Sequence, residues 1–207
     1  GWSRRGKHVC IPLRLEPFET KTIVLAGGTA RPDKVAPTTY EKITEAQRLD
    51  GDWTFTLEGK ERSGPLKTWS DYGSPGYSGS VLYRKQFQYA GPAAAKDLYL
   101  DLGDVKYSAK VRLNGRDLGV RAWQPFRWAV GDALQSGSNL LEVEVTNTAA
   151  NELAGSPERL KEIEARGWLK NSYSRIYLKF DAEMVPSGLL GPVRLLHLHV
   201  LPGAAKK

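Results

Sequence analysis

The chain has 207 residues, of which 41% are hydrophobic and 26% are charged, and its formal net charge is +7. This length and composition fit one sizeable globular domain, alone or with a small appendage. No apolar run approaches the roughly 18 to 20 residues of a membrane-spanning helix, and the single cysteine excludes an intrachain disulfide and a cysteine-based zinc site.

The positive charge is a first mark of nucleic-acid-binding proteins. The basic residues are nevertheless scattered along the chain, and the densest runs, residues 4–7 and 206–207, stand near its two ends. The ends of a domain are usually poorly ordered. The distribution therefore favours an ordinary basic surface, and single-stranded nucleic-acid binding stays a distant alternative.

The beginning of the chain predicts strands followed by a linker. In residues 9–25 apolar residues alternate with others and a β-branched run follows, whereas residues 26–44 are rich in Gly, Pro and Thr. Residues 1–25 are too few to bury a core, so we expect them to be terminal strands of a preceding domain or a strand pair packed on the main one. The chain starts without Met and shows no signal peptide, so we expect a piece of a longer protein.

Residues 45–202 predict one β-rich domain, and residues 203–207 a disordered tail. Short alternating runs separated by Gly- and Pro-rich turns predict strands at 53–57, 81–89, 97–103, 139–147, 174–180 and 192–201. Such a series is typical of an antiparallel β-sandwich. One short decorating helix is expected, with Ser156 as N-cap, Pro157 in its first turn and Gly167 at its end. The aromatic residues expected in the core are Trp53, Tyr83, Phe87, Phe126 and Trp128.

A β-hairpin is predicted around Asn114-Gly115, because both residues suit the positive φ angles of a type I′ turn. This turn places Arg112 opposite Asp117 as a pair of opposite charges on the outer face. If the same register continues away from the turn, the next pair is Val111 with Leu118. The apolar residues that would then share the inner face are Ala109, Val111, Leu113, Leu118 and Val120.

Residues 98–147 resemble the galactose-binding-like jelly roll, the sugar-binding type of β-sandwich found in glycoside hydrolases. The residues that match its V-x-L-N-G hairpin, its P-F pair and its G-x-N-x-L-x-V-x-V strand are Val111, Leu113, Asn114, Gly115, Gly119, Pro125, Phe126, Gly137, Asn139, Leu141, Val143 and Val145. Similar family strands stand at "LDGDWTF", "SGSVLYRKQF" and "PSGLLGPVRL", which extends the resemblance over roughly residues 48–200. The segments "TWSDY" and "SGLLGPVRL" are similar to accessory modules of rhamnosidase-like glycoside hydrolases.

The resemblance implies a non-catalytic accessory domain beside the catalytic domain of the same parent chain, in a secreted or periplasmic protein. Such a domain either binds a plant or microbial polysaccharide or only braces the catalytic domain. The fold does not choose between the two, because function depends on the site. Neither a membrane nor a nucleic acid is among the partners that the resemblance implies.

The candidate binding site lies in the loop after the hairpin, where Trp123 falls outside the strand pattern. In the resembling family this loop shares one end of the sandwich with two other segments of the chain. The candidate carbohydrate-binding residues are therefore Trp123, Arg121, Tyr77, Asp181, Glu183 and Trp168. An indole would stack on a sugar ring while the polar groups bind its hydroxyls. The alternative is that Trp123 packs against Trp168 on the neighbouring long loop.

No self-contained active site is predicted, because glycoside hydrolysis needs two facing carboxylates. Glu142 and Glu144 share the outward face of a strand, and Asp101 and Asp104 flank a turn. We therefore expect a chain that is not an enzyme by itself and requires no cofactor.

Two pairs of residues are candidates for metal ligands. The resemblance implies a structural calcium ion, for which Asp50 and Asp52 are the candidate ligands. His197 and His199 stand two residues apart on a predicted strand and share one side of it. A metal there would need a further ligand from another strand, and the sequence favours an exposed polar face instead.

Overall fold

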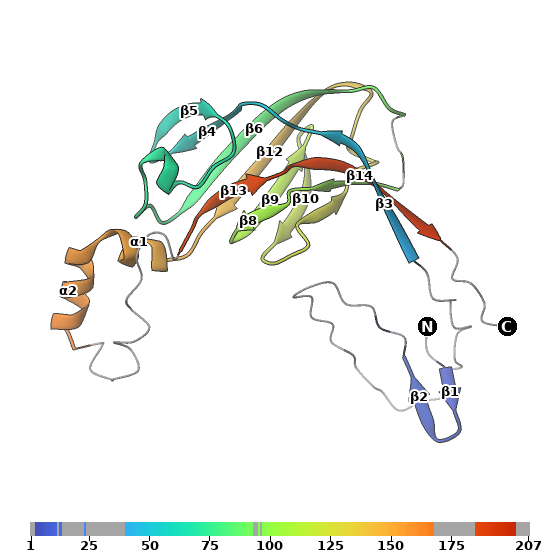
Figure 1. Cartoon of the computed structure of the whole chain (residues 1–207), viewed down its shortest axis with the longest axis horizontal. Coiled ribbons are helices and arrows are strands. Elements are labelled where there is room, and N and C mark those ends of the chain that lie inside the picture. Colours follow the sequence, from blue (N-terminus) through green and yellow to red (C-terminus); the bar gives the residue numbers. More distant parts are fainter. Residues whose placement is uncertain are drawn as a thin grey trace.

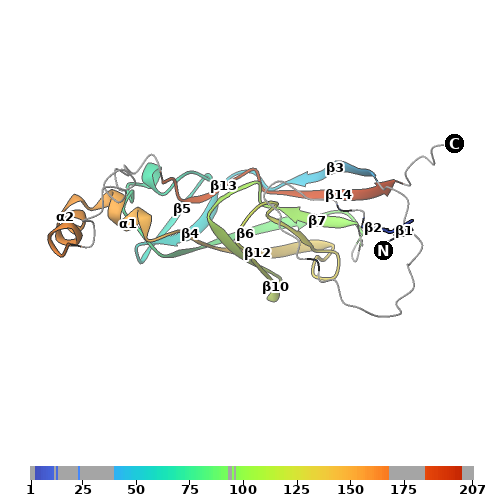
Figure 2. The same cartoon turned by 90° about the horizontal axis from the view of Figure 1, so that it is seen from below.

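The computed structural model describes residues 3–11, 13, 23, 40–92, 95, 97–167 and 185–201. Within them the chain forms two antiparallel sheets packed as an all-β sandwich, which confirms the predicted fold class (Figure 1). The strands of the larger sheet, in spatial order, are β10 (Arg116–Arg121), β9 (Ser108–Leu113), β12 (Gly137–Thr146), β6 (Ser80–Tyr89), β4 (Trp53–Leu57) and β5 (Lys60–Gly64). Those of the smaller sheet are β11 (Arg127–Ala129), β7 (Leu98–Asp101), β14 (Arg194–Leu201) and β3 (Tyr40–Arg48). Figure 2 shows β3, β14 and β7 as one layer and β6, β12 and β10 as the other.

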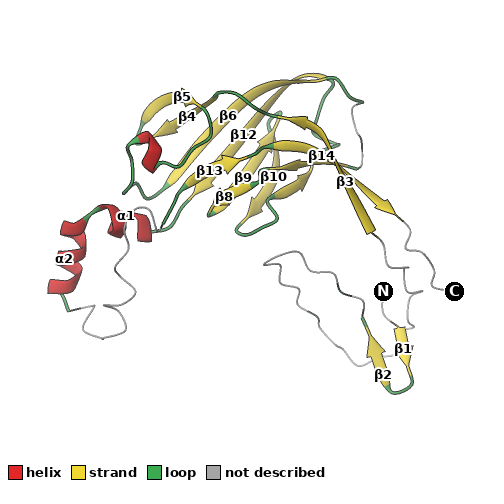
Figure 3. Cartoon of the chain, viewed as in Figure 1, coloured by secondary structure: helices red, strands yellow, loops and turns green. Residues whose placement is uncertain are grey.

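Short elements complete the described part of the chain. Two further pairs are β13 (Gly188–Gly191) with β8 (Asp104–Lys106) and β1 (Ser3–Arg5) with β2 (His8–Cys10), and η1 (Ser70–Tyr72) is one turn of 3₁₀ helix. The predicted helix is α2 (Pro157–Ala165), and a second short helix, α1 (Ala150–Gly155), precedes it. Both helices project beyond the end of the sheets (Figure 3). No helix among these residues is long and apolar enough to cross a membrane.

The core follows the strand alternation of the sequence. In β4 the residues Trp53, Phe55 and Leu57 are buried and the two threonines between them are exposed. All five aromatic residues expected in the core are buried, as are the apolar residues of β9 and, in β12, Leu141, Val143 and Val145. Each fully buried large apolar side chain stabilises the fold by about 1.5–3 kcal/mol. Because the apolar residues alternate along these strands, their burial determines which face of each strand turns inward.

The hairpin between β9 and β10 corrects the predicted register. The turn forms at Asn114-Gly115 with positive φ at both residues, and Asp117 stands opposite Arg112 as expected. The register then shifts, because Val111 pairs with Gly119 and not with Leu118. Leu118 is thus the extra residue of a β-bulge.

Local chemistry accounts for the bulge. Gly119 has a φ of +93°, and its N–H donates to the Asp117 carboxylate across 2.8 Å. That carboxylate also forms its ion pair with Lys110, 3.2 Å away, and not with the Arg112 directly opposite. Beyond the bulge every side chain of β10 changes face, so that Val120 is 64% exposed where the unshifted register would bury it.

Several predicted segments lie partly or wholly outside the described residues. β3 begins at Tyr40, so residues 40–44, which the sequence analysis assigned to the linker, lie in a strand. These residues form a strand because β3 pairs with β14 from Tyr40 to Arg48. This long-range pairing outweighs the linker-like composition of residues 40–44. The predicted strand at 174–180, the tail at 203–207 and most of residues 1–39 lie outside the described part of the chain.

Candidate functional site

A hollow of about 410 Å³ opens where the edge strands of the two sheets meet, beside the loop from β10 to β11. Its lining residues are Leu118, Gly119, Val120, Arg121, Ala122, Trp123 and Trp128. Gly119, Val120 and Arg121 belong to β10 beyond its bulge, Leu118 is the bulge residue, and Trp128 comes from β11. The hollow is therefore a product of the bulge and of the contact between the two sheet edges.

Trp123 presents an exposed indole at this hollow. Its side chain is 58% exposed, although the next aromatic residue along the chain, Phe126, is buried in the core. Phe126 and the end of β10 thus anchor the loop on both sides of Trp123 and leave the indole at the surface. Single exposed apolar residues are common on proteins, but an exposed indole next to a hollow is a typical feature of ligand sites.

Arg121 and Trp128 lie beside this indole. The shifted register places Arg121 opposite Ala109, a buried residue, so the arginine lies on the core-facing side of the strand, although it stays exposed at the edge of the sheet. Its guanidinium carbon lies 5.6 Å from the centroid of the buried Trp128 ring, within the range of a cation–π contact. The site thus contains the buried Trp128 ring, the positively charged Arg121 guanidinium with its several hydrogen-bond donors, and the exposed flat indole of Trp123.

The structure brings together only part of the predicted cluster. Arg121 and Trp123 line one hollow, whereas Tyr77 precedes β6, three strands away from β10 in the sheet. The Tyr77 ring packs against Trp69 with 5.4 Å between centroids, and its hydroxyl donates to the Ser80 carbonyl. Asp181, Glu183 and Trp168 lie outside the described residues.

Sequence reasoning missed two of the residues at the hollow. Trp128 was expected only as a core residue, and Val120 was placed on the inner face. The signal that could have corrected both is the sequence Asp117-Leu118-Gly119 after the turn, because a glycine there permits the positive φ that re-aims the strand.

The geometry around Asp50 and Asp52 does not fit the calcium ion that the resemblance implies. Their carbonyl oxygens accept hydrogen bonds from the ammonium group of Lys85, at 2.6 and 2.7 Å. The Asp50 carboxylate in turn pairs with Arg48 at 2.7 Å. A calcium ion needs six to eight oxygen ligands. Here the two carbonyl oxygens already bind the ammonium group of Lys85.

Two of the carboxylates considered for catalysis, Asp101 and Glu142, pair with arginines. Asp101 is buried and pairs through one oxygen with Arg127 at 3.3 Å and Arg194 at 3.2 Å. Glu142 pairs with Arg84 on the outer face of the larger sheet. Each carboxylate thus balances a neighbouring arginine, and neither stands opposite a second acid in the way that glycoside hydrolysis requires.

Comparison with known proteins places the chain beside glycoside hydrolases. A curated protein of Formosa agariphila named "Putative beta-glucuronidase" is 32% identical, and the match covers 78% of this chain and 16% of that protein. The structure of a rhamnosidase from Novosphingobium sp. PP1Y superposes with a TM-score of 0.57 and 28% identity, over 81% of this chain and 16% of the rhamnosidase. A β-glucuronidase from Ruminococcus gnavus is less similar, with a TM-score of 0.44 at 19% identity over 52% of this chain and 22% of the enzyme. No protein-family model matches the chain.

These comparisons confirm the expected likeness to glycoside hydrolases. The chain is an all-β domain similar to one part of such enzymes, and it spans 16% of the length of both the curated relative and the rhamnosidase. The narrower galactose-binding-like assignment stays a prediction.

Proposed function

We propose that this chain is a non-catalytic accessory domain of a glycoside hydrolase and that it binds carbohydrate in the hollow beside Trp123. The observation that carries the proposal is the exposed indole of Trp123 at a concave site that also contains Arg121 and Trp128. The likeness to one part of longer glycoside hydrolases supports the accessory role. The catalytic domain of the same parent chain would be its covalent partner, in a secreted or periplasmic enzyme.

The proposed binding mode is stacking assisted by a cation. The apolar face of a sugar ring would lie on the Trp123 indole, and the Arg121 guanidinium would donate to hydroxyl or carboxylate oxygens. Small-molecule sites usually have volumes of roughly 300–1,000 Å³. The hollow of about 410 Å³ lies near the lower end of this range and suits a short saccharide segment.

An acidic sugar is the favoured ligand class. The guanidinium of Arg121 can bind a carboxylate through two parallel hydrogen bonds, and the net charge of the chain is +7. The name of the Formosa agariphila relative also refers to a glucuronide, a sugar that carries a carboxylate. We therefore expect uronate-containing saccharides to bind more tightly than neutral ones.

A structural brace is the second candidate function. Val120 lies next to Trp123 and is also largely exposed, so the two make a small apolar surface on which another domain of the parent enzyme could pack. In that case Trp123 would be an interface anchor, because large aromatic residues dominate the binding energy of such surfaces.

Affinity electrophoresis of the 207-residue chain in gels with neutral or uronate-containing polysaccharides, at low and high salt, tests the proposal. We expect retardation that Trp123→Ala and Arg121→Ala each weaken by about tenfold or more, which corresponds to about 1.4 kcal/mol. Ile43→Ala is the matched control, because Ile43 is an exposed apolar residue on β3 in the other sheet. No retardation on any polysaccharide, with all variants folded by circular dichroism, would refute carbohydrate binding and favour the brace. Binding that is lost at high salt and that Trp123→Ala leaves unchanged would indicate attraction by charge alone.

A further inference from the structure

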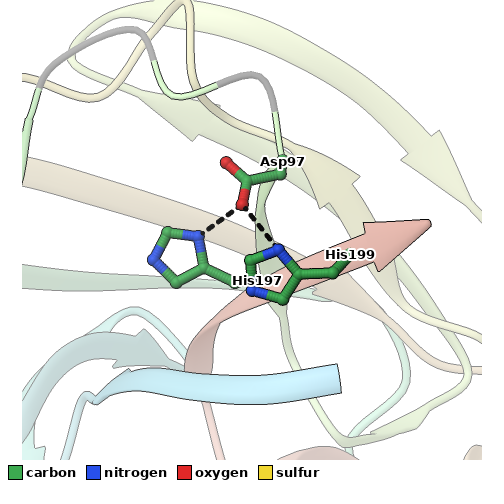
Figure 4. Close-up of side chains that lie close together, drawn as sticks. All are labelled: Asp97, His197 and His199. Atoms are coloured by element: carbon green, nitrogen blue, oxygen red, sulfur yellow. Dashed lines mark hydrogen bonds and ion pairs between the residues drawn. The ribbon is translucent and has the colours of Figure 1, made fainter. Parts of the chain in front are cut away.

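Three metal-binding side chains come together on the smaller sheet, in residues that the hollow beside Trp123 does not include (Figure 4). His197 and His199 lie two apart on β14, so both point to the same side of the strand. Asp97 directly precedes β7, which pairs with β14 so that Leu98 stands opposite His197. A backbone hydrogen bond of 2.8 Å from the Leu198 N–H to the Asp97 carbonyl holds the two segments together.

The three side chains converge on one point. Figure 4 shows the Asp97 carboxylate above the two imidazole rings, with one oxygen facing both. The Nδ1 atoms of His197 and His199 lie 2.9 and 3.4 Å from this Oδ2. The rings are nearly parallel, with 5.6 Å between centroids and 12° between planes, and the three possible ligand atoms all lie within 4.8 Å of one another.

These distances suit a small metal ion. Ligand atoms at about 2.0–2.1 Å from a tetrahedral zinc ion lie about 3.3 to 3.5 Å apart. The His199 nitrogen–oxygen distance of 3.4 Å matches this separation and the His197 distance of 2.9 Å is shorter. The remaining separation, within the 4.8 Å that bounds the trio, would have to shorten for one ion to bind all three atoms.

Without a metal, the Nδ1 of His197 forms a hydrogen bond of 2.9 Å with the Asp97 carboxylate, and His199 approaches the same oxygen at 3.4 Å. A metal ion instead uses the lone pair of each Nδ1, which leaves each ring proton on Nε2. The hydroxyl of Thr44 lies 3.5 Å from the Nε2 of His199, where it can accept this proton or, in the other tautomer, donate its own. Partners that orient the second ring nitrogen in this way are typical of metal-binding histidines.

We propose that Asp97, His197 and His199 bind one divalent transition-metal ion of the zinc class. Two imidazole nitrogens and one carboxylate oxygen form a ligand set that zinc, copper and nickel prefer, whereas calcium and magnesium prefer oxygen ligands alone. Three protein ligands leave a fourth position of a tetrahedral ion for water or another small ligand.

The site is reachable from solvent and would tie two strands together. The side chains of Asp97, His197 and His199 are 38%, 29% and 46% exposed. His197 also lines a second hollow, of about 780 Å³, together with Gln47 of β3 and Gln88 of β6. Because an ion that binds only the folded chain stabilises it, zinc would raise the melting temperature by linking β14 to the start of β7.

Calorimetric titration of zinc chloride into the chelator-treated 207-residue chain tests the proposal. We expect one equivalent to bind, with affinity lowered by more than about tenfold in His197→Gln, His199→Gln and Asp97→Asn. The matched control is the double variant His8→Gln, Cys10→Ser, which removes the remaining histidine and the single cysteine of the chain.

A thermal melt with and without zinc supplies the second measurement. The ion should raise the melting temperature of the parent chain and of the control variant, and not that of His199→Gln, the variant at the most exposed of the three positions. The proposal is overturned if no equivalent binds, if the three substitutions leave the affinity unchanged, or if the control variant loses it.

Discussion

Asn139 is the residue whose loss should most clearly expose the internal bracing of the hairpin. Its side chain is buried at the start of β12 and makes four hydrogen bonds. Its Oδ1 accepts from the Gln135 N–H at 2.9 Å and from the Asn114 side chain at 2.8 Å. Its Nδ2 donates to the carbonyls of Gln135 at 2.8 Å and Gly137 at 2.9 Å. The substitution Asn139→Ala removes all four at once.

The cost follows from these contacts. Each net hydrogen bond contributes about 0.5–1.5 kcal/mol, so four of them set a range of about 2–6 kcal/mol. Gln135 is exposed, and water can replace its lost partners, whereas Asn114 and Gly137 are partly buried. We therefore expect Asn139→Ala to lower the free energy of unfolding by about 3 kcal/mol.

Urea unfolding followed by tryptophan fluorescence measures this change. The control is Gln88→Ala, because Gln88 carries an exposed polar side chain on the neighbouring strand β6, opposite Ser138. This control should stay within about 0.5 kcal/mol of the parent chain. A loss below about 1 kcal/mol for Asn139→Ala, or one no larger than that of the control, would refute the argument that this network braces the hairpin.

The remaining predictions concern one buried and one exposed hydrogen bond. Tyr83→Phe should cost about 1–3 kcal/mol in the same urea assay, because it leaves the buried indole N–H of Trp69, now 2.7 Å from the Tyr83 hydroxyl, without an acceptor. The Gly119 N–H and then Lys110 lower the pKa of the Asp117 carboxyl, so its contribution to stability is present above the unfolded value of about 3.9 and is lost as pH falls through the folded value. The stability difference between the parent chain and Asp117→Asn should therefore shrink in acid, and a constant difference from pH 7 to pH 2.5 would contradict this assignment.

The network of Asn139 also bears on the resemblance to sugar-binding jelly rolls. Asn114 and Asn139 are both motif residues of that resemblance, and their side chains bond to each other at 2.8 Å. Asn114 also accepts the N–H of Leu140 and donates to the carbonyl of Ala133. These two asparagines thus hold the turn of the hairpin against β12. These two motif residues therefore stabilise the fold, and the proposed binding residues Arg121, Trp123 and Trp128 are not part of the motif.

Much of the fold was predictable from local sequence. Strand alternation at residues 53–57 and 139–147 and the Asn114-Gly115 turn predicted strands, buried faces and the first pairs of the hairpin. The physical reason is that side chains alternate across a strand, and that few residue types adopt positive φ at low cost. The same patterns set Trp123 apart from the strands, but they left open whether it binds a ligand or packs against Trp168.

The tertiary structure decided what the side chains do together. The bulge at Leu118 turns Arg121 toward Trp128 and Val120 toward solvent, although the local alternation predicts the opposite. Asp97 joins His197 and His199 only because β7 pairs with β14, across a separation of 100 residues along the chain. Sequence by itself determines the periodicity of each strand, whereas register shifts and long-range strand pairing depend on the sum of contacts over the whole sandwich.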